Sequence, residues 1–333
     1  MTLADTLATY LADHWRRPVA VESLARIPGG ASRETWRFDA VLQDERRPLI
    51  LRRDPGGSLI ETERRVEFAA LQTVQGLLPA PEPLVLEEGD ALGHPFFIMA
   101  RVDSGVVPSP FAPDPYAPHA AEIGHAFFHH LGRLAALDPA GTPLASVTPS
   151  PAPADCWRVA LDHWAAVIDA DEQHPQPIVR AAIRRLRANP PPPPARVAVV
   201  HGDYRSGNFL HDGAGRLLAI LDWEMAHLGD PLEDLGWALD PLWCHGDPAR
   251  VAGLLPRAEA LAIWSAAGGL AVDEAALAWW SLFAAVKAQA IWTSAAREWA
   301  DGGMADPILA ISGWYTARAH DLILAEQLER FAR

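Results

Sequence analysis

The alternation of apolar and polar residues over the first hundred positions predicts a small sheet accompanied by helices. Residues 1–15 have the mixed pattern of an amphipathic helix. Short runs separated by Gly, Pro and charged residues predict three strands, a compact apolar run predicts a last strand, and helical spacing predicts an intervening helix. These strands are expected at 21–27, 35–41, 49–51 and 95–99, and the helix at 61–71. We therefore expect an antiparallel β-lobe with a leading helix that spans residues 1–101 and ends near Arg101.

From residue 120 onward the pattern is mainly helical, which predicts a second domain over residues 102–333. Helices are expected at 121–137, 157–170 and 178–187, and over most of the chain beyond about residue 232. The longest apolar stretch, 275–286, is far shorter than the ~20 residues that span a bilayer, so it predicts a buried helix. A length of 333 residues also favours two lobes over one continuous core. The fold class is therefore α+β.

Two apolar runs in the second domain each lead into a polar segment. The run 196–200 precedes His201-Gly202-Asp203-Tyr204-Arg205-Ser206-Gly207-Asn208, and the run 217–221 ends at Asp222-Trp223-Glu224. Both runs have the composition of buried strands, with a turn at 212–215 between them. We therefore expect both polar segments at the C-terminal ends of buried strands.

Charge and cysteine content exclude several classes of protein. The chain has 28 basic and 42 acidic residues and a formal net charge of −14, which opposes a nucleic-acid or anionic-membrane surface. Its two cysteines, Cys156 and Cys244, are too few for a disulfide framework or a Cys-rich zinc site. The N-terminus lacks the pattern of a secretory signal, so the expected location is cytoplasmic.

The polar segments carry the residue types that phosphoryl transfer requires. This reaction needs a carboxylate that orients the attacking hydroxyl and accepts its proton, and oxygen ligands that hold Mg²⁺ against the phosphates. Asp203 suits the first task, and Asn208 and Asp222 suit the second. Hard oxygen ligands favour Mg²⁺ over zinc. Arg205 could stabilise the charge that develops on the transferred group.

The amino-acid sequence of these segments resembles that of a known family. His-Gly-Asp, four residues, Asn, and then a strand ending in Asp is similar to the core of aminoglycoside phosphotransferases and choline-kinase-like enzymes, which are relatives of the protein kinases. HGDYRSGNFL and ILDWEMAHLGDPLEDLGW resemble more closely the kinase-like domains fused to some acyl-CoA dehydrogenases. The resemblance implies a protein-kinase-like bilobal fold with ATP and Mg²⁺ between the lobes. It implies the same roles for Asp203, Asn208 and Asp222, and makes His201 a brace of the catalytic loop.

The resemblance also assigns nucleotide-binding residues in the β-lobe. Pro-Gly-Gly-Ala-Ser at 28–32 would be the loop over the phosphates, with Gly29, Gly30 and Ser32 as its contacts. The family usually has a strand lysine paired with a helix glutamate. Here the strand reads Leu-Ile-Leu-Arg-Arg at 49–53, so Arg52 is the expected substitute, paired with Glu67.

Other residues near these motifs have either a functional or a structural interpretation. Met99 would flank the adenine, although a core strand also explains it. Glu224 follows Asp222 by two positions, so both side chains could reach the metal from an extended segment. Asp-Pro-Leu-Glu at 230–233 is typical of a helix start, and Asp230 and Asp234 are interpreted as structural.

The function predicted is transfer of the γ-phosphate of ATP to a hydroxyl of a small molecule. Two alternatives are a catalytically silent nucleotide or metabolite sensor, suggested by Arg52, and a metal hydrolase using His201, Asp203 and Asp222. A true aminoglycoside kinase is a third, but residues 251–333 carry a net charge of only −3, against −6 for 201–250. Six tryptophans in 251–333 suit an apolar pocket. Together with the resemblance, they favour a hydroxyacyl-type acceptor.

Overall fold

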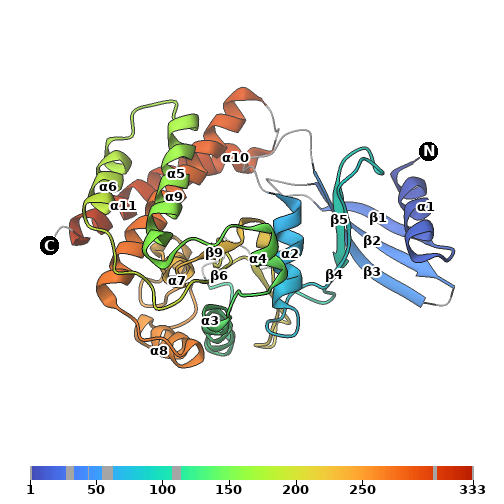
Figure 1. Ribbon diagram of the computed structural model, residues 1–333, viewed down its shortest axis with the longest axis horizontal. Coiled ribbons are helices and arrows are strands. Elements are labelled where there is room, and N and C mark those ends of the chain that lie inside the picture. The colour runs from blue at the N-terminus through green and yellow to red at the C-terminus, as the bar shows by residue number, and fades with distance from the viewer. Residues whose placement is uncertain are drawn as a thin grey trace.

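The protein consists of a sheet-containing N-terminal lobe and a helical C-terminal part, seen in a computed structural model (Figure 1). The structure describes residues 2–27, 34–43, 45–54, 63–106, 114–302 and 306–331. The N-terminal sheet is antiparallel, with strand order β1-β2-β3-β5-β4. Its lobe contains α1 (Leu3–Trp15), β1 (Ala20–Ile27), β2 (Glu34–Leu42), β3 (Glu45–Arg53), α2 (Arg64–Val74), β4 (Pro83–Glu87) and β5 (Phe96–Ala100).

The two faces of the sheet are covered by different helices, as the alternation of side chains along a strand requires. On one face, Leu7 and Leu11 of α1 pack in a cluster that includes Phe96 of β5. On the other face, Phe97 meets Phe68 of α2 edge to face, with ring centroids 6.1 Å apart. The core around Phe68 continues into the C-terminal part, so α2 packs against both halves of the molecule.

The strand predictions for this lobe were incomplete in two places. The third strand begins at Glu45 and pairs with β2 along its whole length, whereas only its apolar centre at 49–51 was predicted. Strand β4 was not predicted, because Pro79, Pro81 and Pro83 obscured it. It is an edge strand that begins at Pro83, a position where proline is tolerated since no ladder hydrogen bond is lost.

The C-terminal part consists mainly of helices around short two-stranded ladders. Its helices are α3 (Ala120–Ala136), α4 (Pro143–Val147), η1 (Pro153–Asp155), α5 (Cys156–Asp171), α6 (Pro177–Ala188), η2 (Trp223–Met225), α7 (Leu232–Ala238), η3 (Pro241–Cys244), α8 (Arg257–Gly268), α9 (Glu274–Asp301), α10 (Pro307–Ile311), the π-helical turn η4 (Ser312–Thr316) and α11 (Ala317–Phe331). The predicted helices at 121–137, 157–170 and 178–187 correspond within one residue to α3, α5 and α6.

Four short strands position the polar segments. They are β6 (Ala198–Val200), β7 (Phe209–His211), β8 (Leu217–Ile220) and β9 (His227–Gly229), and β6 pairs with β9 while β7 pairs with β8. The strands β7 and β9, three residues each, were not predicted, since so short a run carries no measurable period. The predicted strand at 196–200 is reduced to its last three residues.

Helix α9 forms the centre of the helical part. Its 28 residues contact α5, α6, α7 and α11, and the predicted buried helix at 275–286 lies within it. Leu277, Trp280, Phe283 and Val286 are fully buried in the main core. Within the described ranges, no helix is both long and apolar enough to cross a membrane.

Candidate active site

The loop that follows β6 is fixed by a buried histidine. His201 is inaccessible to solvent; its Nδ1 accepts a hydrogen bond from the backbone N–H of Asp203 at 3.1 Å, and its Nε2 lies 2.9 Å from the carbonyl oxygen of Leu221. These partners require the neutral ring with the proton on Nε2. Burial lowers the pKa of His201, in agreement with that form. His201 therefore joins the loop of Asp203 to the strand that leads to Asp222.

A residue of α7 also holds this loop, through hydrogen bonds to its backbone. The carboxylate of Asp234 accepts the backbone N–H groups of His201 at 2.6 Å and Gly202 at 2.9 Å. Gly202 has a φ of +83°, and a Cβ atom there would lie 2.3 Å from the carbonyl oxygen of Met225. Only glycine allows this close approach of the two segments. The structural role predicted for Asp234 is thus the support of the loop that carries Asp203.

The carboxylate of Asp203 is held by three side-chain donors. Its Oδ1 accepts Nε1 of Trp237 at 2.8 Å and Nε of Arg205 at 3.0 Å, and its Oδ2 accepts Nδ2 of Asn208 at 2.5 Å. The guanidinium of Arg205 lies over the ring of Trp243, 4.7 Å from its centroid. Neither tryptophan was singled out from the sequence. A rigid, oriented carboxylate of this kind is suited to receive a proton from a positioned hydroxyl.

Asn208 lies beside Asp203, and the backbone N–H of Leu221, the residue before Asp222, donates to the carbonyl oxygen of Asn208. Nδ2 of Asn208 donates both to the side chain and to the carbonyl oxygen of Asp203, which turns Oδ1 of the amide toward other partners. The chain passes from β8 into η2 at Asp222 with a left-handed backbone, φ 67°. The extended geometry expected for 222–224 is wrong, because Trp223–Met225 form a 3-10 turn whose tryptophan packs into the core.

Arg52 connects the sheet lobe to this segment. Its Nη1 lies 2.5 Å from Oε1 of Glu67 and 3.2 Å from Oδ1 of Asp222, and its Nη2 lies 3.0 Å from Oε2 of Glu224. Burial alone would lower the pKa of Arg52, but the carboxylates of Glu67, Asp222 and Glu224 raise it above its ordinary value. Three carboxylates around one guanidinium leave an excess of two negative charges.

The remaining β-lobe predictions are placed as follows. Arg53 points to the opposite face of β3, where it pairs with Glu34 at 2.6 Å. Met99 is half-buried on β5 and packs against the main core. Gly29, Gly30 and Ser32 lie outside the described residues. The structure thus brings Arg52 and Glu67 together with Asp222 and Glu224, and separates Arg53 from them.

A buried lysine that was not singled out from the sequence contacts the loop of Asp203. Lys287 of α9 is 1% exposed, donates to the carbonyl oxygen of Gly202, and lies 3.4 Å from Oε1 of Glu233. Its ammonium faces the rings of Trp164 and Trp237 at 5.5 and 5.3 Å. Both polar groups of Gly202 are thereby engaged, its N–H by Asp234 and its C=O by Lys287. The 85-residue separation from Gly202 gives this contact no local sequence signal.

The donor set beside Asp203 fits a hard divalent cation. Asp222 has a side chain that is 37% exposed, and Asn208 offers an amide oxygen. Oxygen donors of these two kinds, with the local excess of negative charge, are the ligands that Mg²⁺ prefers. No three His, Cys, Asp or Glu side chains converge as a metal site in the part of the chain described.

A comparison with protein families identifies the family of the chain. The model of the phosphotransferase enzyme family matches residues 23–280, more than three quarters of the chain. The chain belongs to the phosphotransferase enzyme family. The matched range includes Arg52, Glu67, the loop of Asp203 and Asp222.

Similar proteins agree with this assignment. The phosphotransferase is 26% identical over 228 residues to chicken (Gallus gallus) acyl-CoA dehydrogenase family member 11, a match that covers 67% of this chain and 28% of that protein. Its fold matches a Ralstonia eutropha protein assigned to the aminoglycoside phosphotransferases, with a TM-score of 0.75, 20% identity and 98% of both chains covered. A ternary complex of the aminoglycoside phosphotransferase APH(4)-Ia with AMP-PNP and hygromycin B gives a TM-score of 0.59 at 17% identity, with 98% of both chains covered.

These findings confirm the predicted family, the protein-kinase-like fold and the identification as an enzyme that transfers phosphoryl groups. The resemblance to domains found within acyl-CoA dehydrogenases is also confirmed. The phosphotransferase spans little more than a quarter of the length of the curated relative described above.

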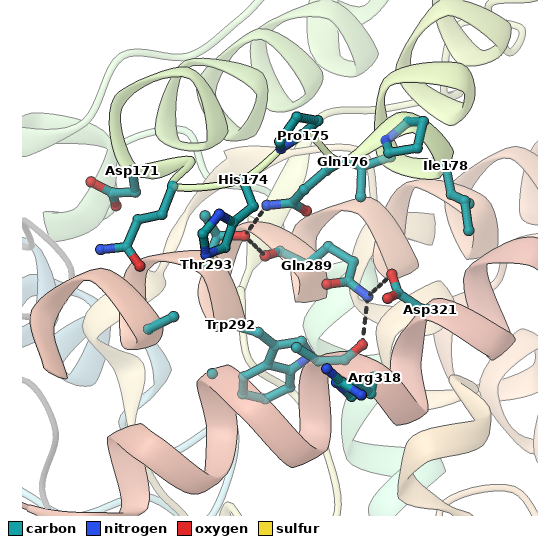
Figure 2. A pocket seen from close by; sticks show the side chains of 16 residues that line it. Asp171, His174, Pro175, Gln176, Ile178, Gln289, Trp292, Thr293, Arg318 and Asp321 are labelled. Atoms are coloured by element: carbon teal, nitrogen blue, oxygen red, sulfur yellow. Dashed lines mark hydrogen bonds between the residues drawn. The ribbon is translucent and has the colours of Figure 1, made fainter. Parts of the chain in front are cut away.

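The tryptophans of the C-terminal helices do not line one apolar pocket in the phosphotransferase. Trp264, Trp279 and Trp280 are at most 1% exposed in the core, whereas Trp299 and Trp314 are on the surface. Trp292 lines a cavity of about 420 Å³ between α9, α11 and the connection from α5 to α6 (Figure 2). Its other residues are mixed, with Gln176, Gln289, Arg318 and Asp321 among the polar ones. Trp237 instead donates to Asp203, and Trp243 stacks against Arg205, which also bonds to Asp203.

Proposed function

We propose that this phosphotransferase is an ATP- and Mg²⁺-dependent kinase that phosphorylates a hydroxyl group of a small molecule with substantial apolar character. The observation that carries the proposal is the carboxylate of Asp203, which is oriented by hydrogen bonds from Trp237, Arg205 and Asn208. Phosphoryl transfer depends on such positioning and on stabilisation of charge, and needs little covalent chemistry from the protein.

The roles of the residues follow from their contacts. Asp203 accepts a hydrogen bond from the acceptor hydroxyl and takes its proton as the new O–P bond forms and the bond from the γ-phosphorus to its bridging oxygen breaks, releasing ADP. Arg205, fixed between Asp203 and the ring of Trp243, stabilises charge on the transferred group. Magnesium, when bound with ATP, would neutralise phosphate charge, and Asn208 and Asp222 would hold it.

The nucleotide side of the site is assigned to the β-lobe. Arg52 provides a permanently charged fork for the phosphates, and Glu67 fixes its orientation from the buried side. Glu224 is assigned to the same cluster, as a partner of Arg52 and a further oxygen near the metal. Gly29, Gly30 and Ser32 are proposed as the loop over the phosphates, and Met99 as a neighbour of the adenine.

A hydroxyacyl-type acceptor is favoured by the surroundings of the base. Near Asp203, the half-buried ring of Trp243 supplies apolar surface, and Arg205 opposes a polycationic sugar. The names of the curated relatives, acyl-CoA dehydrogenase family members 10 and 11, support an acyl compound as the substrate class.

The test is a comparison of acceptors at equal concentration with the purified protein, Mg²⁺ and ATP. ADP release and addition of phosphate detected by mass spectrometry should be seen with hydroxyacyl thioesters and hydroxy acids and be absent from Asp203→Asn. Phosphorylation of kanamycin alone would refute the acceptor class. Nucleotide binding without turnover on any hydroxyl compound would favour the sensor alternative instead.

A further inference from the structure

A second cavity lies beside the candidate active site and is separate from the one in Figure 2. Its volume is about 570 Å³, and it is bounded by α2, the connection 147–151, α5 and the segment 224–229. Most of its wall is apolar, with Val66, Trp164, Met225 and Leu228 contributed by different elements. Among the predicted site residues that the structure describes, Glu224 alone lines it. The cavity therefore adjoins the site without including the base.

The buried polar side chains that line this cavity already form hydrogen bonds or ion pairs with other residues of the protein. Glu233 lies 3.0 Å from Nε2 of His227 and 3.4 Å from Nζ of Lys287, while Nδ1 of His227 bonds to the carbonyl oxygen of Met225. Both ring nitrogens of His227 are thus engaged, and the Lys287 ammonium is shared between Glu233 and Gly202. Glu63 and His163 also line the cavity but are exposed, so the buried part of the lining matches an uncharged, apolar ligand.

Two elements that form the walls, α2 and the segment 224–229, also carry or contact residues of the active site. Val66 precedes Glu67, the buried partner of Arg52, and Glu224 itself contacts Arg52. Met225 touches Gly202, which directly precedes the base and binds Lys287. A molecule that fills the cavity therefore contacts the supports of both the nucleotide cluster and the catalytic loop.

We propose that this cavity is a ligand site for a compact, uncharged aromatic or apolar molecule, and that its occupancy changes catalysis through Met225, Glu224 and Lys287. The ligand is an effector and is distinct from ATP and from the phosphoryl acceptor. The site is independent of which hydroxyl compound the enzyme phosphorylates.

The probes are indole and quinoline, which have no hydroxyl group and cannot be phosphorylated. Binding is measured by saturation-transfer NMR and by thermal shift, and its consequence by the affinity for Mg·ATP and the turnover number. Ala160→Phe places a ring in the cavity from α5, and Ala166→Phe places the same ring on the exposed side of that helix. Wild type and Ala166→Phe should bind the probes, and Ala160→Phe should bind them about tenfold more weakly or not at all.

Probe binding should change turnover or nucleotide affinity in wild type and Ala166→Phe, and should have no effect in Ala160→Phe. If Ala160→Phe does not fold, Val159→Trp at the exposed rim takes its place. Equal binding to the filled and control variants, or binding without any functional effect, would overturn the proposal. Competition with the acceptor would also overturn it and assign the cavity to the acceptor site. The nucleotide-affinity readout remains informative if no acceptor is found.

Discussion

The indole Nε1 of Trp237 donates a hydrogen bond of 2.8 Å to Oδ1 of Asp203, so a residue of α7 sets the direction of the candidate base. Trp237 is 1% exposed and lies in the same helix as Asp234, which holds the backbone before Asp203. One helix therefore positions both the main chain and the side chain of the base.

Trp237→Phe should reduce turnover while largely preserving the affinity for ATP. Loss of a hydrogen bond to a charged group costs ~1.5–3 kcal/mol, which corresponds to roughly 10–100-fold in rate if it acts in the transition state. Trp264→Phe is the matched control, because that indole is equally buried and its Nε1 makes no hydrogen bond among the described residues. If both variants lost turnover equally, packing and not the hydrogen bond would be responsible.

Asp203→Ala and Asp222→Ala should have different effects. The first removes the base and leaves the proposed metal donors in place, so turnover should fall ~10²–10⁴-fold with little change in nucleotide affinity. The second should weaken binding of Mg·ATP itself. Steady-state kinetics combined with calorimetric titration of Mg·AMP-PNP separates the two. Near-normal turnover of Asp203→Ala would remove this residue from the mechanism.

Arg52→Ala should raise the Michaelis constant for ATP on the order of tenfold or more, since charge-assisted hydrogen bonds to the phosphates would be lost. It should also lower the melting temperature, because the guanidinium partner of the buried Glu67 is removed. Arg52→Lys should retain part of the ATP affinity and part of the thermal stability, because lysine keeps the positive charge but has fewer hydrogen-bond donors. Arg53→Ala is the control on the opposite face of β3. A larger effect on ATP from Arg53→Ala than from Arg52→Ala would contradict the assignment.

The ion pair of His227 and Glu233 should make stability depend on pH. Burial alone would lower the pKa of His227, but the Glu233 carboxylate raises it above its ordinary 6.5. The pair therefore stabilises the fold fully below pH 6.5, and this contribution is lost as the pH rises through the raised pKa. The difference in melting temperature between wild type and His227→Gln should accordingly shrink across that interval. A difference independent of pH would show that His227 does not titrate there.

The sequence predicted the parts of the site that are local in the chain. The loop after β6 carries both Asp203 and Asn208, and Asp222 comes shortly after β8. Hydrophobic periodicity predicted the ends of α3, α5 and α6 to within one residue. Arg52 and Glu67 were paired correctly in space because a strand and the next helix are neighbours. These features depend on contacts over short stretches of chain, where pattern and spacing carry information.

The supports of the site could not be predicted in the same way. Trp237 reaches Asp203 across 34 residues, and Lys287 reaches Gly202 across 85, so tertiary packing alone creates these contacts. The buried Lys287 lies in an apolar helix where the pattern predicts only packing. The strands β7 and β9 are too short to produce a period, and β4 is masked by its prolines.

The contact of Gly202 with Met225 has a consequence for how nucleotide can enter and leave. Together with the pairing of β6 and β9 and the hydrogen bond from Leu221 N–H to the carbonyl oxygen of Asn208, it holds the loop of Asp203 and the segment that begins at Asp222 together. The β-lobe reaches Asp222 and Glu224 through the side chain of Arg52, and α2 also packs against η2. Opening of the enzyme should therefore be a hinge motion that parts these ion pairs, while the spacing of Asp203 and Asp222 stays constant throughout the cycle.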